Sequence, residues 1–316
     1  MEGNIYRPEG SLLSAAENKS YLSSLSGLSA AMSEGKILEG IATVCEPGMN
    51  LSVNLGGRFG IIPRGEAAYC MNGDDVKDIA VITRVGRAVA FKVIGFEKDQ
   101  SGKSYPVLSR RAAQKECMEE YLMKLTPGDI IEAKVTHLEQ FGAFVDIGCG
   151  ITSLLSIDCI SVSRISHPRD RLSVGMRIPV IIKSIDRDSG RIYVTHRELL
   201  GTWEENAARF KVGQTVSGIV RSVESYGVFV EIAPNLAGLA ELRDDISVGQ
   251  ITAAYIKSII PEKMKIKLVL IDSYKGEKVP FETEYFIDTE AVDHIDYWRY
   301  SPYSCDKLIE TVFSSI

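Results

Sequence analysis

The sequence VTHLEQFGAFVDI, residues 135–147, occurs again as VRSVESYGVFVEI, residues 220–232. The offset is 85 residues, and a glycine followed by a polar residue precedes each copy at the same offset, at Gly128-Asp129 and at Gly213-Gln214. A repeat of this kind indicates two copies of one structural module. Because each copy alternates apolar and polar residues around a glycine, the repeat predicts β-strands.

Alternation along these strands divides the side chains between two faces, since successive residues of a strand point to opposite sides. Phe144 has the parity of the carboxylate Asp146. Phe229 has the parity of Glu231, so both phenylalanines are predicted to face solvent together with these carboxylates. The opposite, core-facing positions are aliphatic: Ala143, Val145 and Ile147 in one copy, and Val228, Val230 and Ile232 in the other.

A second aromatic residue, Phe141 or Tyr226, stands three positions before each phenylalanine. The glycine that follows it, Gly142 or Gly227, would permit a β-bulge that turns both rings to the same side. Two outward rings on a β-surface form a platform on which unpaired bases stack, at about 1–3 kcal/mol per base. The alternative for Phe141 and Tyr226 is that they close one end of a barrel.

The rest of the chain predicts a mainly β fold, with small barrels in series joined by short helices. Residues 35–111 contain further short apolar runs bounded by glycine, such as LSVNL and VGRAVAFKVIGF. Helices are predicted at 17–34, where apolar residues recur at three- and four-residue spacing and would pack on the first barrel, and between modules at 110–122 and 198–210. The predicted division is an N-terminal segment and helix at 1–34, barrels at 35–111, 127–197 and 211–273, linker helices at 112–126 and 198–210, and an appendage at 274–316.

The C-terminal residues 274–316 match no module. They contain nine aromatic residues among many carboxylates. So large an apolar content argues against a disordered acidic tail. We expect a folded α/β appendage that packs on the third barrel.

The net charge of −6 argues at first against nucleic acid, whose partners are usually basic. The acidity is concentrated, however, in residues 274–316, with 4 basic against 9 acidic side chains. Residues 35–111 carry 11 basic against 8 acidic side chains, and the other two barrels are neutral. Neutral modules still bind single strands through stacking and a local basic groove, whereas strong duplex binding is not expected.

Several other classes of protein are disfavoured. No apolar run reaches the roughly 18 residues that cross a bilayer, and the N-terminus lacks the features of a signal peptide. The six cysteines form no CxxC pair, which indicates reduced thiols and no zinc ribbon. The four histidines form no HxxxH or HxH pair, and no P-loop or nucleophile motif occurs. We therefore expect a cytoplasmic protein without a membrane segment, metal, cofactor or catalytic activity.

The second barrel contains one insertion relative to the third. Gly175 and Gly249 are 74 rather than 85 residues apart, so the second barrel has 11 extra residues before these glycines. The insertion contains a basic loop, residues 164–171, which can supply contacts to a phosphate backbone. Its candidate RNA contacts are Arg164, His167 and Arg169, and Arg171 follows them. The alternative is a solvated loop closed by turn residues around Pro168. His137 could reach a phosphate or be an ordinary surface histidine.

The second barrel resembles the S1 RNA-binding domain, an OB-fold barrel that occurs in repeats in ribosomal protein S1. The matching segments are GDIIEAKV, FGAFVDI, GITSLLSID and VGMRIPVIIKSIDRDSGRIYVTHRE. The third barrel resembles it through GQTVSGIVRSVESYGVFVEI, NLAGLAEL and VGQITAAYIKSI, and GKILEGIATV with LSVNLGGRFGIIPRGE makes residues 36–111 a diverged copy. The resemblance covers residues 36–272 and implies three tandem five-stranded OB-fold barrels.

The resemblance also implies an RNA surface made of two strand aromatics, a histidine, and an Asp and an Arg that flank the last hairpin. By position, the second barrel supplies Phe141, Phe144, Asp186 and Arg191, with Ser156 in place of the histidine. The third supplies Tyr226, Phe229 and Lys265, with Glu241 at the histidine position and Ile260 at the aspartate position. The first has Met49 and Ser52 where the aromatics belong, which puts RNA binding by that barrel in doubt.

These observations predict a protein of the ribosomal protein S1 type that binds single-stranded RNA, including mRNA in translation. The small ribosomal subunit is a further candidate partner, and we expect a monomer. One alternative is an S1-domain regulator of RNA decay or transcription. Another is a protein-interaction scaffold whose barrels have lost RNA binding, which the acidic balance and the missing histidines favour. The outward aromatics favour RNA.

Overall fold

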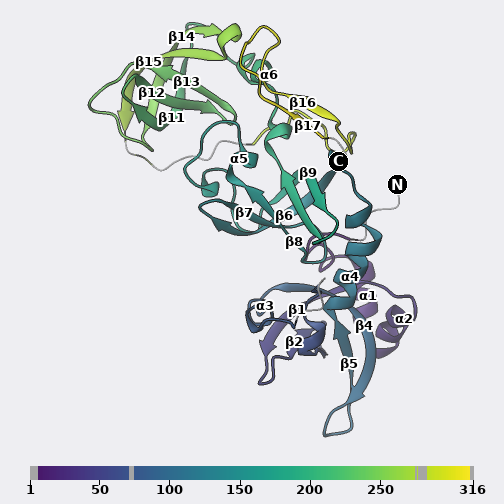
Figure 1. The fold of residues 1–316 in the computed structure, drawn as a ribbon. Helices are drawn as coiled ribbons and strands as arrows, with labels where there is room; N and C mark the ends of the chain where they lie inside the picture. Colours follow the sequence, from purple (N-terminus) through teal and green to yellow (C-terminus); the bar gives the residue numbers. More distant parts are fainter. Residues whose placement is uncertain (1–5, 71–74, 275, 277–282, 314–316) are drawn as a thin grey trace.

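The short strands close into three five-stranded barrels that follow one another in an elongated row (Figure 1). The computed structural model describes residues 6–70, 75–274, 276 and 283–313. In each barrel the strands pair in the order first, second, third, fifth, fourth, and the barrel closes through a parallel pair between the third and fifth strands. The prediction of a mainly β chain with three OB-type barrels is confirmed.

The strands of the first barrel are β1 (Leu38–Cys45), β2 (Leu51–Asn54), β3 (Phe59–Ile62), β4 (Ala88–Lys98) and β5 (Ser104–Ser109), with the short helices η1 (Arg64–Glu66) and α3 (Asp78–Ile82) between β3 and β4. The second barrel contains β6 (Ile130–Glu139), β7 (Gly142–Asp146), β8 (Thr152–Ser156), β9 (Arg177–Asp186) and β10 (Arg191–Thr195). Its insertion holds α5 (Ile157–Ile160) and η3 (Pro168–Asp170). The third barrel contains β11 (Thr215–Glu224), β12 (Gly227–Ala233), β13 (Leu236–Ala240), β14 (Ile251–Ile260), η5 (Pro261–Lys263) and β15 (Lys265–Tyr274).

The barrel interiors are built from the predicted core positions. The aliphatic side chains on the inward face of β7 and β12 are almost completely buried, and they pack against inward side chains of the other strands of the same barrel. They are Ala143 and Val145 in β7, with Ile147 directly after the strand, and Val228, Val230 and Ile232 in β12. Burial of such side chains contributes about 1.5–3 kcal/mol for each large one, which makes the alternation decisive for the fold.

The N-terminal segment contains two helices, so the prediction of one continuous helix at 17–34 is wrong. The helices are α1 (Ala16–Leu22) and α2 (Leu25–Ser33). Ser24 caps α2, because its hydroxyl accepts the N–H of Gly27 at 2.9 Å, and this cap fixes the start of a new helix. As predicted, the helices pack on the first barrel, with Leu22 and Leu28 in its core.

The two joints between barrels differ. The first is a helix, α4 (Arg110–Glu120), followed by one turn, η2 (Leu122–Lys124), as predicted. The second is broken into η4 (Arg197–Leu200) and α6 (Trp203–Ala207), so the continuous helix predicted at 198–210 is wrong. The break lies at Gly201, whose φ is +80° and where a Cβ atom would lie 2.6 Å from the ring of Phe286.

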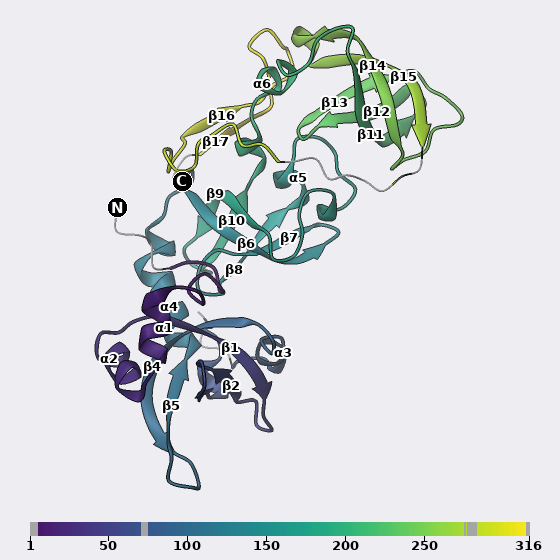
Figure 2. The ribbon, with the colours of Figure 1, turned by 180° about the vertical axis from the view of Figure 1, so that it is seen from behind.

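The appendage lies alongside both the second and the third barrel (Figure 2). Its two strands, β16 (Tyr297–Arg299) and β17 (Glu310–Val312), form a small sheet, and residues 283–313 contain no helix, so the α/β prediction is wrong for this described part. Trp298 and Tyr300 join the core of the third barrel. Phe313 packs on Ile181 and Leu199 of the second barrel and its joint. The prediction of packing on the third barrel alone was therefore incomplete.

The carboxylates of β7 and β12 do not face solvent, contrary to the prediction from their parity. Asp146 is 2% exposed and accepts the backbone N–H groups of Glu9, Gly148 and Gly150 at 2.7, 2.9 and 3.0 Å. Burial, with the nearby charge of Glu9, raises the pKa of Asp146 to about 7. Glu9 in turn forms an ion pair with Arg110 at 2.7 Å. Asp146 therefore joins the second barrel to the N-terminal segment and α4.

Glu231, the matching carboxylate of the third barrel, is fully buried in an ion-pair network. Arg221 holds one of its oxygens at 2.6 and 2.7 Å and also pairs with Asp170 at 3.0 Å. Arg171 pairs with the other oxygen. Because Asp170 and Arg171 belong to the insertion of the second barrel, this network fixes the insertion to the third barrel.

Within the described ranges, no helix combines the length and the apolar content that crossing a bilayer requires.

Candidate nucleic-acid interface

The second-barrel ring pair, Phe141 and Phe144, lies on the outer surface of the barrel at the start of β7. Phe141 is 56% exposed and Phe144 is half-buried. The ring centroids are 6.2 Å apart and the planes are perpendicular, so the edge of one ring meets the face of the other. The two predicted residues are thus in contact, and each ring keeps one face turned away from its partner.

Both rings lie on one side, although not for the predicted reason. Phe141 stands in the turn before β7, outside the strict alternation of the strand. The bulge lies on the partner strand β6, between Val135 and His137. A Cβ atom on Gly142 would lie 2.5 Å from the carbonyl oxygen of Leu155, so this glycine is required by the close approach of β8.

The ring pair continues into a stripe of outward side chains across four strands. From β6 to β10, register partners place His137 beside Phe144, Phe144 beside Leu154, and Leu154 beside Tyr193. The ring of His137 lies 6.4 Å from that of Phe144 at 30°. His137 was open in the sequence reasoning, and Tyr193 was missed, although its place between the inward Ile192 and Val194 gives it outward parity.

Arg191 lies beside this stripe. It lines a groove of about 360 Å³ together with Phe144, Leu154 and Tyr193. Asp186 on β9 is the strand-register partner of Arg191 on β10. The carboxylate of Asp186 accepts the hydroxyl and N–H of Ser189, and these hydrogen bonds lower its pKa. Asp186 therefore shapes the turn that presents Arg191.

The third-barrel ring pair, Tyr226 and Phe229, repeats the geometry of the second. Tyr226 is 67% exposed, Phe229 is half-buried, and their centroids are 6.0 Å apart at 87°. Lys265 is the strand-register partner of Ile260 across the β14–β15 hairpin, at the positions that Arg191 and Asp186 occupy in the second barrel. The structural register thus agrees with the positions assigned from the sequence.

The sequence suggested that the basic loop extends the RNA surface of the second barrel. In the structure it does not. Arg171 is buried against Glu231 and is not available to RNA. Arg164 lines a groove of the third barrel together with Tyr226 and Phe229. His167 caps η3 by accepting the N–H of Arg169 at 3.1 Å, and the Arg169 guanidinium lies 3.2 Å from the same ring.

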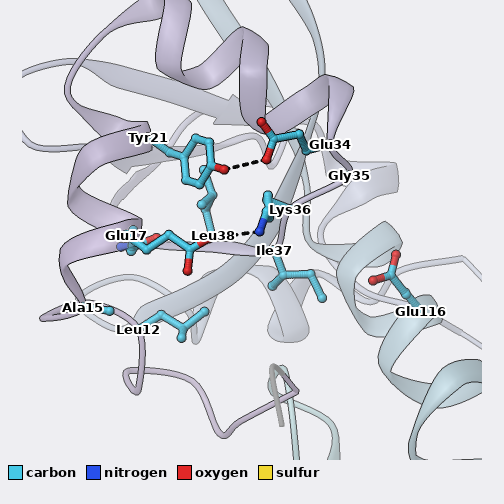
Figure 3. Close-up of a pocket in the computed structure, with 11 residues that line it drawn as sticks. Leu12, Ala15, Glu17, Tyr21, Glu34, Gly35, Lys36, Ile37, Leu38 and Glu116 are labelled. Carbon is cyan, nitrogen blue, oxygen red and sulfur yellow. Dashed lines mark hydrogen bonds and ion pairs between the residues drawn. The ribbon is translucent and has the colours of Figure 1, made fainter. Parts of the chain in front are cut away.

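The first barrel differs from the other two. Met49 stands in the turn before β2 and Ser52 on β2, and the described residues of this barrel include no pair of contacting aromatic rings. A pocket of about 340 Å³ lies between its N-terminal helices and α4 (Figure 3). In this pocket the hydroxyl of Tyr21 donates a hydrogen bond to the carboxylate of Glu34. The ammonium of Lys36 forms an ion pair with Glu17. Three carboxylates around one paired lysine make this pocket unsuited to a phosphate backbone.

Comparison with known proteins gives consistent results. The profile of the S1 RNA binding domain family matches residues 124–197. The small ribosomal subunit protein bS1 of Staphylococcus aureus is 30% identical over 291 residues, which are 86% of this chain and 71% of that protein. The bS1 homolog of Bacillus subtilis is 30% identical over 79% of this chain and 63% of its own length. A solved multidomain protein with nucleic acid binding domains from Streptococcus pneumoniae aligns over 77% of this chain and 76% of that one, with 15% identity and a TM-score of 0.24.

The three closed barrels define a protein of tandem OB-type barrels, and the matched profile makes the second of them an S1 domain. The resemblance to ribosomal protein S1 is thereby confirmed. The chain belongs to the bS1 family of small ribosomal subunit proteins.

Proposed function

We propose that this protein captures single-stranded RNA, including mRNA during translation. The observation that carries the proposal is the recurrence of one ring pair at matching positions on two barrels, Phe141–Phe144 and Tyr226–Phe229. In a monomeric globular domain, a large exposed aromatic ring that contacts a second ring is a natural stacking surface for an unpaired base.

The binding mechanism makes and breaks no covalent bond. In the second barrel, bases stack on Phe141 and Phe144 while Arg191 contacts the backbone phosphate along the groove that it lines with Phe144. Asp186 holds the hairpin turn, and His137 extends the ring surface. Neither role requires a metal or a cofactor.

The barrels contribute unequally. The second and third bind RNA through their ring pairs, and Lys265 is the hairpin cation of the third. The first offers Met49 and Ser52 in place of rings, so its net charge of +3 serves docking onto an RNA-rich or protein partner instead. His167 and Arg169 remain candidate RNA contacts on the exposed side of the basic loop.

Membership of the bS1 family supports the small ribosomal subunit as a second partner, and with it a cytoplasmic location. Each ring pair and its cations lie within one chain, so a monomer is sufficient for binding. An S1-domain regulator of RNA decay or transcription would bind RNA in the same way but with another partner.

A scaffold that binds proteins is the candidate from a different class. Ser156 and Glu241 stand at the positions of the RNA-contacting histidine that the family resemblance implies, which favours the scaffold. Fluorescence anisotropy with labelled single-stranded and double-stranded RNA separates the two. The proposal predicts saturable binding of the single strand, with preference over the duplex. A folded protein that binds neither would support the scaffold.

A further inference from the structure

We propose that the RNA site of the third barrel is completed by two cations from outside that barrel, Arg164 and Lys307. The groove would take a nucleotide unit of a single strand, with the base on Tyr226 and Phe229 and the adjacent phosphates on the two cations. This inference rests on the proposed function and adds to it the residues that make the third site.

The groove has a volume of about 360 Å³ and is lined by the third barrel, the insertion of the second barrel, the joint residue Trp203 and the appendage. Tyr226 and Phe229 form the barrel side. Arg164 comes from the basic loop of the second barrel, and Lys307 comes from the appendage. The volume is in the range of small-molecule sites and is sufficient for one base with its sugar.

Both cations are available to a ligand. Arg164 and Lys307 are exposed, and neither forms a hydrogen bond or an ion pair with any residue that the structure describes. The groove also contains Arg221, which is already paired with Glu231, and one carboxylate, Glu224. Two unpaired cations against one anion favour an anionic ligand.

Asn235 fixes the walls of the groove relative to one another. Its side-chain oxygen accepts the hydroxyl of Ser161 at 2.8 Å and the N–H of Val162 at 2.7 Å, at the start of the basic-loop segment. Its backbone oxygen accepts the hydroxyl of Tyr300 in the appendage. Asn235 is fully buried, and its φ of +61° lies in the left-handed region that asparagine tolerates. Loop, barrel and appendage are thus joined by one residue before any ligand binds.

The source of the cations explains a difference between the two RNA sites. In the second barrel, Arg191 from the last hairpin lines the groove beside the ring. In the third, the matching Lys265 does not line the groove, whereas Arg164 and Lys307 do. The third site therefore depends on the tandem arrangement, and the second does not.

The test uses the full chain carrying Phe141→Ala and Phe144→Ala, so that the third barrel supplies the remaining stacking site. Into this chain we would introduce Arg164→Ala with Lys307→Ala. The matched control is Lys98→Ala with Lys103→Ala, which removes the same charge from the β4–β5 hairpin at the opposite end of the molecule (Figure 1). Anisotropy with a labelled oligouridine of about 12 nucleotides, within the range that OB-folds cover, would give affinity and its salt dependence.

The groove variant should bind roughly threefold to tenfold more weakly, and the magnitude of its log–log salt slope should fall by about 1.4, since it loses two single-strand phosphate contacts and each contributes about 0.7. The control should change affinity less than about twofold, because it changes only the long-range field, which salt screens. The groove substitutions in the otherwise unaltered chain should lower the slope by the same amount, which keeps the test valid if the double phenylalanine variant fails to fold.

Equal behaviour of groove and control variants would overturn this inference and leave the proposed function standing. The same holds if the double phenylalanine variant is folded but no longer binds RNA. Absence of RNA binding by the unaltered chain would overturn the proposed function and, with it, the inference.

Discussion

Removal of the second-barrel ring pair is the most direct test of the stacking mechanism. The change is Phe141→Ala together with Phe144→Ala. Phe141 is 56% exposed, so its loss should hardly affect the fold, whereas the half-buried Phe144 should cost about 1 kcal/mol of stability, roughly half the value of a fully buried phenylalanine. The loss of RNA-binding free energy should be larger than this loss of folding free energy.

The geometry sets the size of the expected loss. Because the two rings are perpendicular, each offers one face to one base, and the pair accommodates at most two bases. At about 1–3 kcal/mol per stacked base, reduced by the coupling of residues in contact, the double substitution should cost about 2–4 kcal/mol. This corresponds to a loss of affinity between about 30-fold and about 700-fold.

Fluorescence anisotropy with a labelled single strand measures the effect, and circular dichroism of the same samples checks the fold. Phe59→Ala is the matched control, because Phe59 is 55% exposed on the first barrel and contacts no other ring in the described part of the chain. The control should leave affinity unchanged. Unchanged affinity in a folded double variant would refute the stacking mechanism at this site, and unfolding would show that the rings belong to the core.

Four further outcomes are expected. If about three phosphates are contacted, the log–log salt slope should be roughly −2, so a fourfold rise in salt weakens binding about 15-fold; a slope of −5 or steeper would show that charge dominates. Tyr226→Ala with Phe229→Ala should cost less affinity than the second-barrel double substitution; an equal or larger loss would reverse the ranking of the barrels. Glu231→Ala should destabilise the chain by about 3–5 kcal/mol in urea unfolding, because it leaves two buried guanidinium groups without their carboxylate; a change below about 1 kcal/mol would contradict the network. The hydrogen bond to Asp129 raises the pKa of His294. The pair therefore stabilises docking of the appendage fully below about pH 6.5, and this stabilisation is lost as the pH rises through the raised pKa. His294→Gln should remove this alkaline loss of stability, which tryptophan fluorescence would measure.

The barrel interiors and the strand aromatics could be predicted because they depend on local alternation, whereas Phe141 and Tyr226 stand in turns outside it. Val145 and Val230 follow directly from the two-residue period of a strand, and Phe144 and Phe229 follow from the opposite parity. The repeat gave the second and third modules, and the family resemblance added residues 36–111 as a diverged first copy. The site residues on the hairpins were assigned through the family resemblance, and the strand register is consistent with that assignment.

The partners of the outward carboxylates could not be predicted, because they come from distant parts of the chain. Asp146 is bonded to the backbone of Glu9, 137 residues away, and Glu231 is paired with Arg171, 60 residues away. Alternation shows that a side chain points out of its own barrel, and it contains no information on what covers that surface. The same limit applies to Arg164, whose position at the third barrel depends on the insertion being fixed by Arg171 and Asn235.

The repeated use of one strand position explains how the ring pairs are held relative to each other. Asp146 and Glu231 both stand two residues after the strand aromatic. Each binds a residue that precedes its own barrel in the chain, through a hydrogen bond from Glu9 and an ion pair with Arg171 respectively. Asn54 occupies the matching place in the first barrel, where it is exposed and accepts the N–H of its neighbour Gly56. Buried ion pairs and hydrogen bonds at such junctions cost desolvation but tolerate little variation in geometry. The second and third ring pairs are therefore presented in a fixed relation. On the proposed function, a strand that binds one pair would have a raised effective concentration at the other.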